Sequence, residues 1–196
     1  MQIGNTPDGW GIVQQSFHWL IAAAVLVQLS VGLIFSNLPE NDPQAGFYYG
    51  IHGTLGVLIL VAMLFRFIWR QSHPVPALPD TLTPPLKTVA RATHWLFYVL
   101  LIALPLGGWA MVSARGYKIA FFGAELPALM GKNQAVADAA FVLHAGGAFT
   151  LIALIVLHAA AALRHEYILE DGTLRRMTPF RQHRRAARPP EHPHRG

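Results

Sequence analysis

Histidines embedded in long apolar stretches are the residues of this chain best suited to chemistry. His144 and His158 lie fourteen positions apart within one apolar run. In an α-helix that spacing places both side chains on nearly one face, roughly 21 Å apart along the axis. Imidazole is costly to place in hydrocarbon, so histidines there indicate function, and imidazole nitrogen is a common metal ligand. The spacing therefore predicts two metal-binding levels, one near each surface of a membrane.

Other apolar stretches supply candidate partners for these two histidines. His18 begins one stretch, His52 opens a second, and His94 begins a third in the same His-Trp-Leu setting as His18. Histidines that are satisfied by hydrogen bonds inside a helical bundle would give the same pattern. Two imidazoles on one helix face, with partners on other helices, favour metal ligation over that alternative. Periodicity does not choose between His18 and His94.

Residue types narrow the identity of the metal group. The chain contains no cysteine, which excludes disulfides, thiolate ligands and the Cys-x-x-Cys-His attachment of a c-type haem. Zinc prefers four ligands, and no third or fourth ligand accompanies either histidine pair. Two axial imidazoles from different helices are what a b-type haem requires when histidine fills both axial positions. We therefore expect two haem b groups, which transfer electrons rather than bind oxygen.

Composition places these sites in a membrane. Hydrophobic residues make up 53% of the chain and charged residues only 13%, with a mean hydropathy of +0.36, whereas charged residues make up about a quarter of an ordinary soluble domain. Four apolar stretches predict membrane-spanning helices, at about residues 14–35, 49–69, 87–112 and 138–165. We expect an all-α fold, a four-helix transmembrane bundle that encloses two b-type haems.

The distribution of charge predicts the orientation of the bundle. Twelve of the 15 basic residues lie on the side of the chain termini, and the other three are Arg115, Lys118 and Lys132. The positive-inside rule then places both termini in the cytoplasm. The expected units are an N-terminal segment at 1–13, a four-span domain at 14–166 and a basic tail at 167–196 that is largely disordered. Basic residues at membrane edges favour a lipid partner and argue against nucleic acid.

This orientation sorts the histidines into a cytoplasmic and an outer level. The cytoplasmic level holds His158 with His18 or His94, and the outer level holds His52 and His144. His165 lies seven residues beyond His158, within about 20° of the same helix face and roughly 10 Å nearer the cytoplasm. Histidines such as His94 and His165 at a membrane edge would hold a quinone through its carbonyl oxygens and pass it protons. Histidines that are merely interfacial would look the same.

Several other residues are expected to surround the haems. Arg66 and Arg70 are candidate partners for the propionates of the cytoplasmic haem, although helix-end arginines that reach for the membrane surface give the same pattern. Arg115 and Lys118 are candidates for pairing with the outer haem or for attracting a small anion. Four glycines next to the outer histidines are expected to let a flat ring approach the backbone: Gly53, Gly56, Gly146 and Gly147. Ordinary helix packing is the alternative role for these glycines.

These residues, together with the motifs around them, resemble the bacterial cytochrome b561 family of four-helix, di-haem membrane proteins. The resemblance covers roughly residues 10–180. It rests on Ser16-Phe17-His18-Trp19, Ile51-His52-Gly53, Ile102-Ala103-Leu104-Pro105-x-Gly107, His144, Leu157-His158-Ala159-Ala160-Ala161-Ala162-Leu163 with His165, and Asp171-x-Thr173-Leu174-x-Arg176-Met177-x-Pro179. By this resemblance, His18 and His158 ligate one haem and His52 and His144 the other. It also implies a quinone site at the cytoplasmic end, where the chain offers Ser16, His94 and His165.

The resemblance further implies a function in the bacterial inner membrane. Some members of the group are similar to superoxide oxidases, which take electrons from superoxide at the outer face and reduce ubiquinone within the membrane. Others are electron-carrying subunits related to the cytochrome b of hydrogenases and formate dehydrogenases, which receive electrons from a redox protein. We expect a superoxide:quinone oxidoreductase. The alternatives are a relay subunit of a larger respiratory complex and a membrane scaffold without redox activity.

Overall fold

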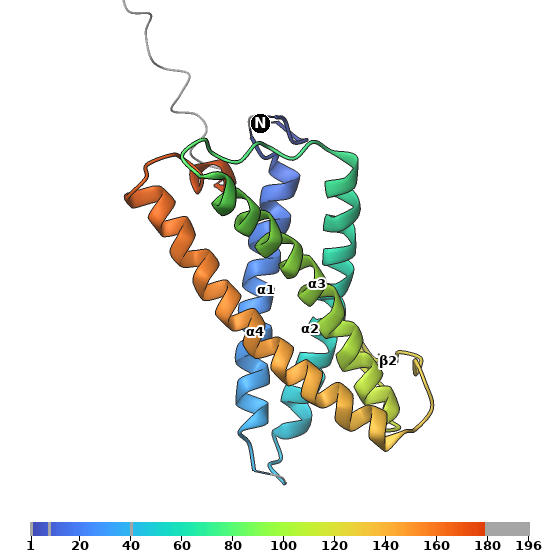
Figure 1. The fold of residues 1–196 in the computed structure, drawn as a ribbon. Helices are drawn as coiled ribbons and strands as arrows, with labels where there is room; N and C mark the ends of the chain where they lie inside the picture. Colours follow the sequence, from blue (N-terminus) through green and yellow to red (C-terminus); the bar gives the residue numbers. More distant parts are fainter. Residues whose placement is uncertain (1, 8, 40, 179–196) are drawn as a thin grey trace, which may run out of the picture.

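Four long helices make up most of the molecule. The computed structural model describes residues 2–7, 9–39 and 41–178. The helices are α1 (Ile12–Ser36), α2 (Ala45–Ser72), α3 (Pro84–Ala114) and α4 (Gln134–Tyr167), and they run up and down in alternation (Figure 1). Each of them is long and apolar enough to cross a membrane. The transmembrane four-helix bundle expected from the sequence is confirmed.

Each helix extends one to four residues beyond its predicted span at both ends. Local chemistry explains where the helices begin and end. Two prolines occupy the first turn of α3, where the missing N–H is not needed. The Asn133 side chain accepts a hydrogen bond from the Val136 amide at 3.2 Å and caps α4. Gly116, with a φ of +85°, ends α3 in the left-handed region that favours glycine.

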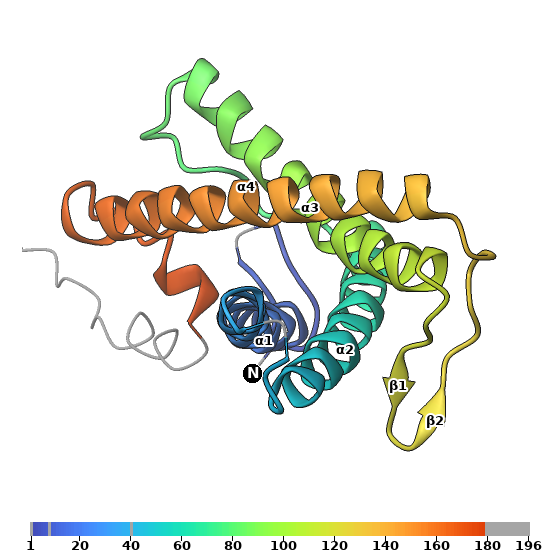
Figure 2. The ribbon, with the colours of Figure 1, turned by 90° about the horizontal axis from the view of Figure 1, so that it is seen from below.

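The two ends of the bundle differ, and we name them by what they carry. At the terminal end, α1 and α3 begin and α2 and α4 end. At the hairpin end, the loop between α3 and α4 forms β1 (Ala120–Phe121) and β2 (Ala124–Glu125), which pair antiparallel. Figure 2 shows this hairpin beside α2, to which it is joined by a 3.1 Å hydrogen bond from Thr54 Oγ1 to the Ala120 carbonyl. The spans predicted at 87–112 and 138–165 leave this segment between them, and no strand was predicted there.

Helix packing leaves one side of the bundle less closely joined than the others. The backbones of α1 and α2 pack along each other, as do those of α2 with α3 and of α3 with α4, whereas α1 and α4 make little backbone contact. All four helices meet at mid-height in one apolar cluster, which consists of Ile21, Val25, Ile59, Met63, Tyr98 and Leu151. This cluster is the mid-bundle layer. The α1–α4 side therefore meets mainly through side chains.

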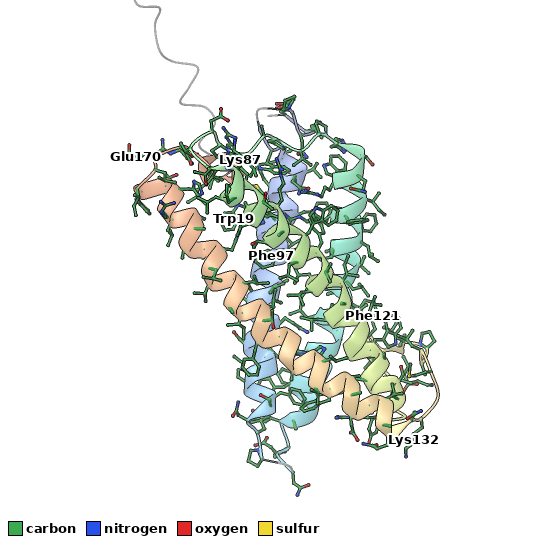
Figure 3. The ribbon with its side chains drawn as sticks, viewed as in Figure 1. Trp19, Lys87, Phe97, Phe121, Lys132 and Glu170 are labelled. Atoms are coloured by element: carbon green, nitrogen blue, oxygen red, sulfur yellow. The ribbon has the colours of Figure 1, made fainter. Side chains whose placement is uncertain are left out.

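The outside of the bundle is apolar over its middle and charged at its ends. Leu143, Leu157 and Phe65 are among the most exposed apolar side chains, at 75%, 65% and 61% exposure. Figure 3 shows charged side chains such as Lys87 and Lys132 at opposite ends of the molecule, with Phe97 between them. Large exposed apolar surface of this extent is what a lipid environment requires.

Three chain segments interlock at the terminal end. They are residues 2–7 with 9–11, the α2–α3 loop at 73–83, and the post-α4 segment at 168–178, which contains the 3-10 helix η1 (Arg175–Met177). The Ala77 amide donates to the Pro7 carbonyl at 3.3 Å, and the Ala77 carbonyl accepts from Arg176 Nη1 at 3.1 Å. The expectation of disorder from residue 167 onward therefore does not describe residues 168–178. The rest of that expected disorder, at 179–196, lies outside the described residues.

We expect Gly11→Ala to loosen the N-terminal segment. A Cβ at Gly11 would overlap backbone atoms of Gly4 and Ile3, and backbone cannot move aside as a flexible side chain does. Overpacking of this kind costs about 1–3 kcal/mol. The measurement is the thermal unfolding midpoint of the purified protein in detergent. The control is Gly9→Ala, because a Cβ at Gly9 would meet nothing within 4 Å. An equal midpoint for the two variants would contradict the expectation.

Candidate functional site

Three histidines from three helices meet near the terminal end. The ring centroids of His18 in α1 and His158 in α4 lie 6.3 Å apart, and those of His94 in α3 and His158 lie 5.7 Å apart. In both pairs the rings meet edge to face. His18 and His158 are half-buried, whereas His94 is exposed. The structure thus brings both of the candidate partners to His158, as the sequence anticipated, and ring spacing alone does not choose between them.

A second histidine pair lies nearer the hairpin end. The ring centroids of His52 in α2 and His144 in α4 are 6.1 Å apart, and both residues are half-buried. Phe35 of α1 packs beside this pair, with its ring centroid 6.2 Å from that of His52. The two histidines that the sequence assigned to the outer level are therefore neighbours in space, and they come from different helices.

The ring spacings suit one metal ion between two imidazoles. An imidazole nitrogen lies about 2 Å from a bound metal such as zinc, so two nitrogens on opposite sides of an ion are about 4 Å apart and the ring centroids lie further back. Separations of 6.1 and 6.3 Å agree with that arrangement. Within the described ranges, no group of three or more His, Asp or Glu side chains is placed to hold a metal ion. Each level therefore offers a pair of nitrogen ligands rather than a zinc-type cage.

The mid-bundle layer separates the two levels. Leu151 lies halfway between His144 and His158 along α4 and is 3% exposed. It packs in the same cluster as Ile21 of α1 and Met63 of α2. The two histidine levels are consequently separate sites with a dry, apolar region between them.

Polar contacts prepare the hairpin-end pair to bind a metal. The Leu104 carbonyl oxygen of α3 lies 3.0 Å from His144 Nδ1. Because a carbonyl only accepts hydrogen bonds, Nδ1 carries the proton and Nε2 keeps its lone pair. His144 can therefore offer Nε2 to a metal at this level.

Two glycines make room for the imidazole rings of the hairpin-end pair. A Cβ at Gly32 of α1 would lie 3.0 Å from His52 Cε1, and a Cβ at Gly108 of α3 would lie 3.1 Å from His144 Cε1. Both contacts are tighter than side chains normally make, so glycine lets each ring sit close to a neighbouring helix. Sequence analysis gave these two glycines no role, because the histidine that each one faces belongs to another helix.

The four glycines singled out in the sequence have other neighbours. A Cβ at Gly56 would lie 3.2 Å from the Gln28 side chain, and a Cβ at Gly147 would lie 2.7 Å from Leu104. These two contacts are helix packing, the alternative that the sequence left open. Gly53 faces the side chain of Ile119, and a Cβ at Gly146 would meet nothing within 4 Å.

Comparison with known proteins places the chain in a family. A profile of the prokaryotic cytochrome b561 family matches residues 9–180, which include all four helices. The chain belongs to this family. It is therefore a membrane cytochrome of the b type that takes part in electron transfer, and the family expected from the sequence is confirmed.

Individual relatives of this cytochrome match over nearly their whole lengths. Cytochrome b561 homolog 2 of Escherichia coli strain K12 is 34% identical over 181 residues, which cover 90% of this chain and 95% of the relative. The probable superoxide oxidase CybB of Yersinia pestis is 32% identical over 170 residues, which cover 87% and 96%. Cytochrome b562 of Cereibacter sphaeroides is 30% identical over 173 residues, which cover 86% and 94%.

Two arginines of the cytochrome lie beside the terminal-end histidines. Arg66 Nη2 is 3.4 Å from His18 Nδ1, and the Arg66 Nε is buried with no partner in the described residues. The Arg70 guanidinium lies 5.5 Å from the ring centroids of both Trp95 and Tyr98. The Arg66 guanidinium also lies 5.9 Å from the ring centroid of Tyr98. Both arginines are therefore placed against aromatic faces, and Arg66 in addition reaches the histidine level.

Arg115, Lys118 and Lys132 surround the hairpin end. Arg115 follows α3 directly, and its guanidinium lies 5.7 Å from the ring centroid of Phe141 in α4. Lys118 is exposed and pairs with Glu125 of the hairpin at 2.8 Å. Surface ion pairs of this kind contribute little to stability. These basic side chains are consequently available to attract anions to this end of the bundle.

The residues expected to hold a quinone are not joined into one network. Ser16 is exposed on α1 and forms no hydrogen bond to His94 or His165 within the described ranges. His165 Nδ1 is instead 2.6 Å from Asp171 Oδ2. Asp171 is a polar partner that sequence reasoning missed, although it begins the Asp-x-Thr motif quoted for the family resemblance.

Asp171 is held as a carboxylate. Burial by itself raises the pKa of this carboxyl group, but hydrogen bonds from Thr173, His165 and Thr81 lower the pKa to about 2. Its side chain is 5% exposed and that of His165 is 12% exposed. The cytochrome therefore carries a nearly buried anion beside a histidine at the terminal end.

Proposed function

We propose that this cytochrome oxidises superoxide at the outer membrane surface and reduces ubiquinone at the cytoplasmic side, passing electrons through two b-type haems. The observation that carries the proposal is the stacking of two histidine pairs, at 6.3 and 6.1 Å, on either side of a buried apolar layer. Two such levels suit the movement of electrons across a bilayer. The name of one relative, a probable superoxide oxidase, supports the choice of donor.

His18 and His158 would hold one haem, and His52 and His144 the other. The residues present suit such a group at the hairpin end, because His144 keeps an Nε2 lone pair, and Gly32 and Gly108 leave space for the His52 and His144 rings. When bound between two imidazoles, haem iron supplies one-electron chemistry without an open coordination position.

Arg66 is suited to a haem propionate. A guanidinium has no acceptor, so the 3.4 Å contact makes His18 Nδ1 the acceptor and places the ring proton on Nε2. For Nε2 to bind iron, that proton must move to Nδ1, and Arg66 then needs another acceptor. A propionate carboxylate is such an acceptor, since arginine pairs with carboxylates through two parallel hydrogen bonds. Arg70 and Arg115, both near aromatic rings, are further candidates for propionate contacts.

The terminal end supplies the groups that a quinone needs. His94 is exposed next to His158, and His165 lies seven residues beyond His158 along α4. Together with Ser16, these side chains are candidates for hydrogen bonds to the quinone oxygens and for proton transfer. Of the ten basic residues in the part of the chain that the structure describes, seven lie on this side, so the positive-inside rule makes it cytoplasmic.

The hairpin end is then the outer face, where Arg115, Lys118 and Lys132 attract the superoxide anion by raising its local concentration. The overall reaction consumes two superoxide anions, one ubiquinone and two protons. It releases two oxygen molecules and one ubiquinol. Each superoxide loses one electron, and the quinone gains two electrons and two protons, so charge and atoms balance.

Purified protein with its haem is the material for the test. We expect it to reduce ubiquinone-1 when superoxide is generated enzymatically, and we expect superoxide dismutase to abolish that reaction. The measurement is the loss of quinone absorbance, with denatured protein of equal haem content as the control. If ubiquinone-1 is reduced no faster with the haem-containing protein than in the uncatalysed reaction, the proposal is overturned. Quinone reduction that appears only after addition of a partner dehydrogenase would favour a relay subunit instead.

A further inference from the structure

The post-α4 segment folds back over the terminal end and is attached to two other elements. The Arg176 carbonyl accepts a hydrogen bond from Gln15 Nε2 of α1 at 3.0 Å, and Arg176 Nη1 donates to the Ala77 carbonyl of the α2–α3 loop at 3.1 Å. The Gln15 side chain belongs to a residue that is 1% exposed. These contacts fix the backbone of residues 168–178 and so determine where Asp171 lies.

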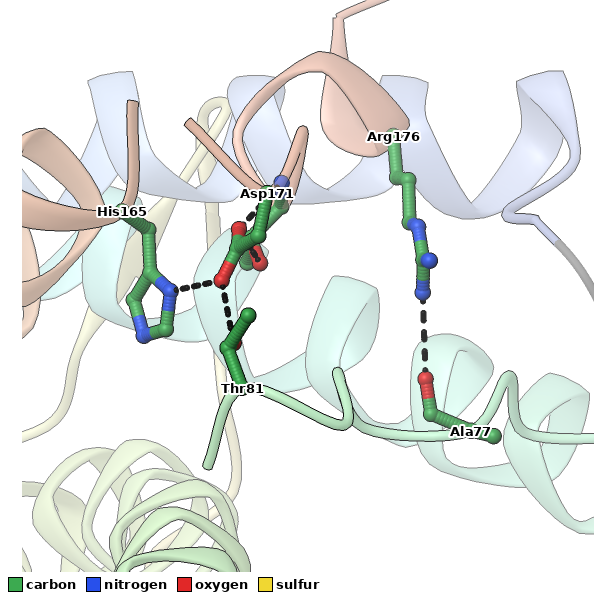
Figure 4. A network of polar contacts seen from close by, with 6 residues as sticks. Ala77, Thr81, His165, Asp171 and Arg176 are labelled. Carbon is green, nitrogen blue, oxygen red and sulfur yellow. Dashed lines mark hydrogen bonds and ion pairs between the residues drawn. The ribbon is translucent and has the colours of Figure 1, made fainter. Parts of the chain in front are cut away.

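Every oxygen of the Asp171 carboxylate is used. Oδ2 accepts from His165 Nδ1 at 2.6 Å and from Thr81 Oγ1 at 2.9 Å, and Oδ1 accepts from the Thr173 amide at 3.0 Å and the Thr173 hydroxyl at 2.6 Å. Figure 4 shows His165 and Thr81 converging on this side chain from different parts of the chain. A carboxylate that accepts four hydrogen bonds has no place left for a proton of its own. Asp171 therefore remains an anion.

An anion in this position determines the chemistry of His165. A carboxylate only accepts, so His165 Nδ1 always carries a proton and Nε2 is the nitrogen that exchanges protons. The same division of roles operates in the Ser-His-Asp triad, where the aspartate orients the histidine and does not itself become protonated.

We propose that Asp171 is the positioning residue that holds His165 for proton transfer to the quinone. This inference rests on the proposed function. His165 Nε2 gives a proton to a quinone oxygen as the quinone accepts electrons, and the ring regains a proton from water at the membrane edge. The ring passes the second proton in the same way, so two electrons and two protons yield one quinol. Asp171 keeps its charge throughout.

Single and double variants test this assignment. They are Asp171→Asn, His165→Gln and the combination of the two. The control is Asp80→Asn, which removes an aspartate charge from the neighbouring loop at a side chain that is fully exposed. Three quantities are measured for each purified protein: haem content from the reduced-minus-oxidised spectrum, the rate of haem reduction by superoxide, and the rate of haem reoxidation by ubiquinone-1.

We expect each single variant to keep its haem content and its rate of haem reduction, and to slow reoxidation by about 10²-fold, the usual effect of losing a general acid. If Asp171 acts through His165, the haem of the double variant is reoxidised at nearly the rate of the His165→Gln variant, within about twofold. Multiplied effects in the double variant, or reoxidation of Asp171→Asn at the parent rate, would overturn the assignment. Asp80→Asn should match the parent.

A parent protein that quinone does not reoxidise would sink the proposed function rather than this inference alone. If the Asp171→Asn protein loses haem, its reoxidation rate cannot be compared with that of the parent. The Thr81→Val variant then tests the assignment. That variant removes one hydrogen bond from Asp171 Oδ2 but leaves the carboxylate in place. We expect this variant to slow haem reoxidation about threefold, which corresponds to the loss of one ordinary hydrogen bond. An unchanged reoxidation rate in a haem-replete Thr81→Val protein would overturn the assignment.

Discussion

Replacing His158 or His52 with alanine is expected to remove about one haem of the two from each variant, and a different haem in each case. His158 is the α4 histidine that meets both His18 and His94 at the terminal-end level, and His52 faces His144 at the other, 6.1 Å away. A haem that loses one axial imidazole keeps a single protein bond to its iron, which is a weaker hold for a b-type group. The measurement is haem per protein, together with the optical spectrum of the haem that remains.

A matched histidine variant controls this experiment. His73 stacks on Trp69 with ring centroids 3.9 Å apart and its Nδ1 lies 3.0 Å from the Trp69 carbonyl, away from both histidine levels. His73→Ala should therefore keep both haems. If His158→Ala and His52→Ala retain the parent haem content, or lose the same haem, then the two-level assignment is wrong.

A second pair of variants separates the two neighbours of His158. We expect His18→Ala to lose about one haem, and His94→Ala to keep both while its quinone reduction falls by about 10²-fold. His94 is exposed beside His158, whereas His18 is half-buried and lies within reach of Arg66, the group proposed to hold a propionate. Haem content and the rate of ubiquinone-1 reduction are measured on the same preparations.

The opposite outcome has a clear meaning for the site. Loss of haem in His94→Ala, with full haem in His18→Ala, would make His94 the ligand, since its ring centroid is 5.7 Å from that of His158. His18 would then be free for the quinone. An unchanged reaction in a haem-replete His94→Ala protein would remove His94 from the proposed quinone site and leave His165 as the remaining histidine there.

Hydrophobic length and histidine spacing carried the prediction of the fold and of the two histidine levels. The four spans could be predicted because a helix that crosses lipid must be long and apolar, and both properties can be read from each segment separately. The levels followed because helical rise converts the fourteen positions between His144 and His158 into a distance. Both inferences use only local geometry, so neither needed knowledge of how the helices pack.

Features that depend on contacts between helices could not be predicted from such local patterns. The β-hairpin at residues 120–125 is too short to show the alternating pattern of a strand. The glycines that touch imidazole rings proved to be Gly32 and Gly108, because the space each one leaves is filled from another helix. The contact of Arg70 with two aromatic rings of α3 likewise joins two helices, and its pairing with a haem propionate stays a prediction.

By itself, the sequence determined that this protein has four apolar spans with histidines spaced to lie at two depths, since residue type, apolar length and helical period are properties of single segments. Only the tertiary structure decided which side chains meet: His158 with both His18 and His94, and Asp171 with His165 and Thr81. Thr81 and Asp171 are 90 positions apart in the chain. Their meeting depends on how the α2–α3 loop and the post-α4 segment fold over the bundle, and no local pattern encodes that arrangement.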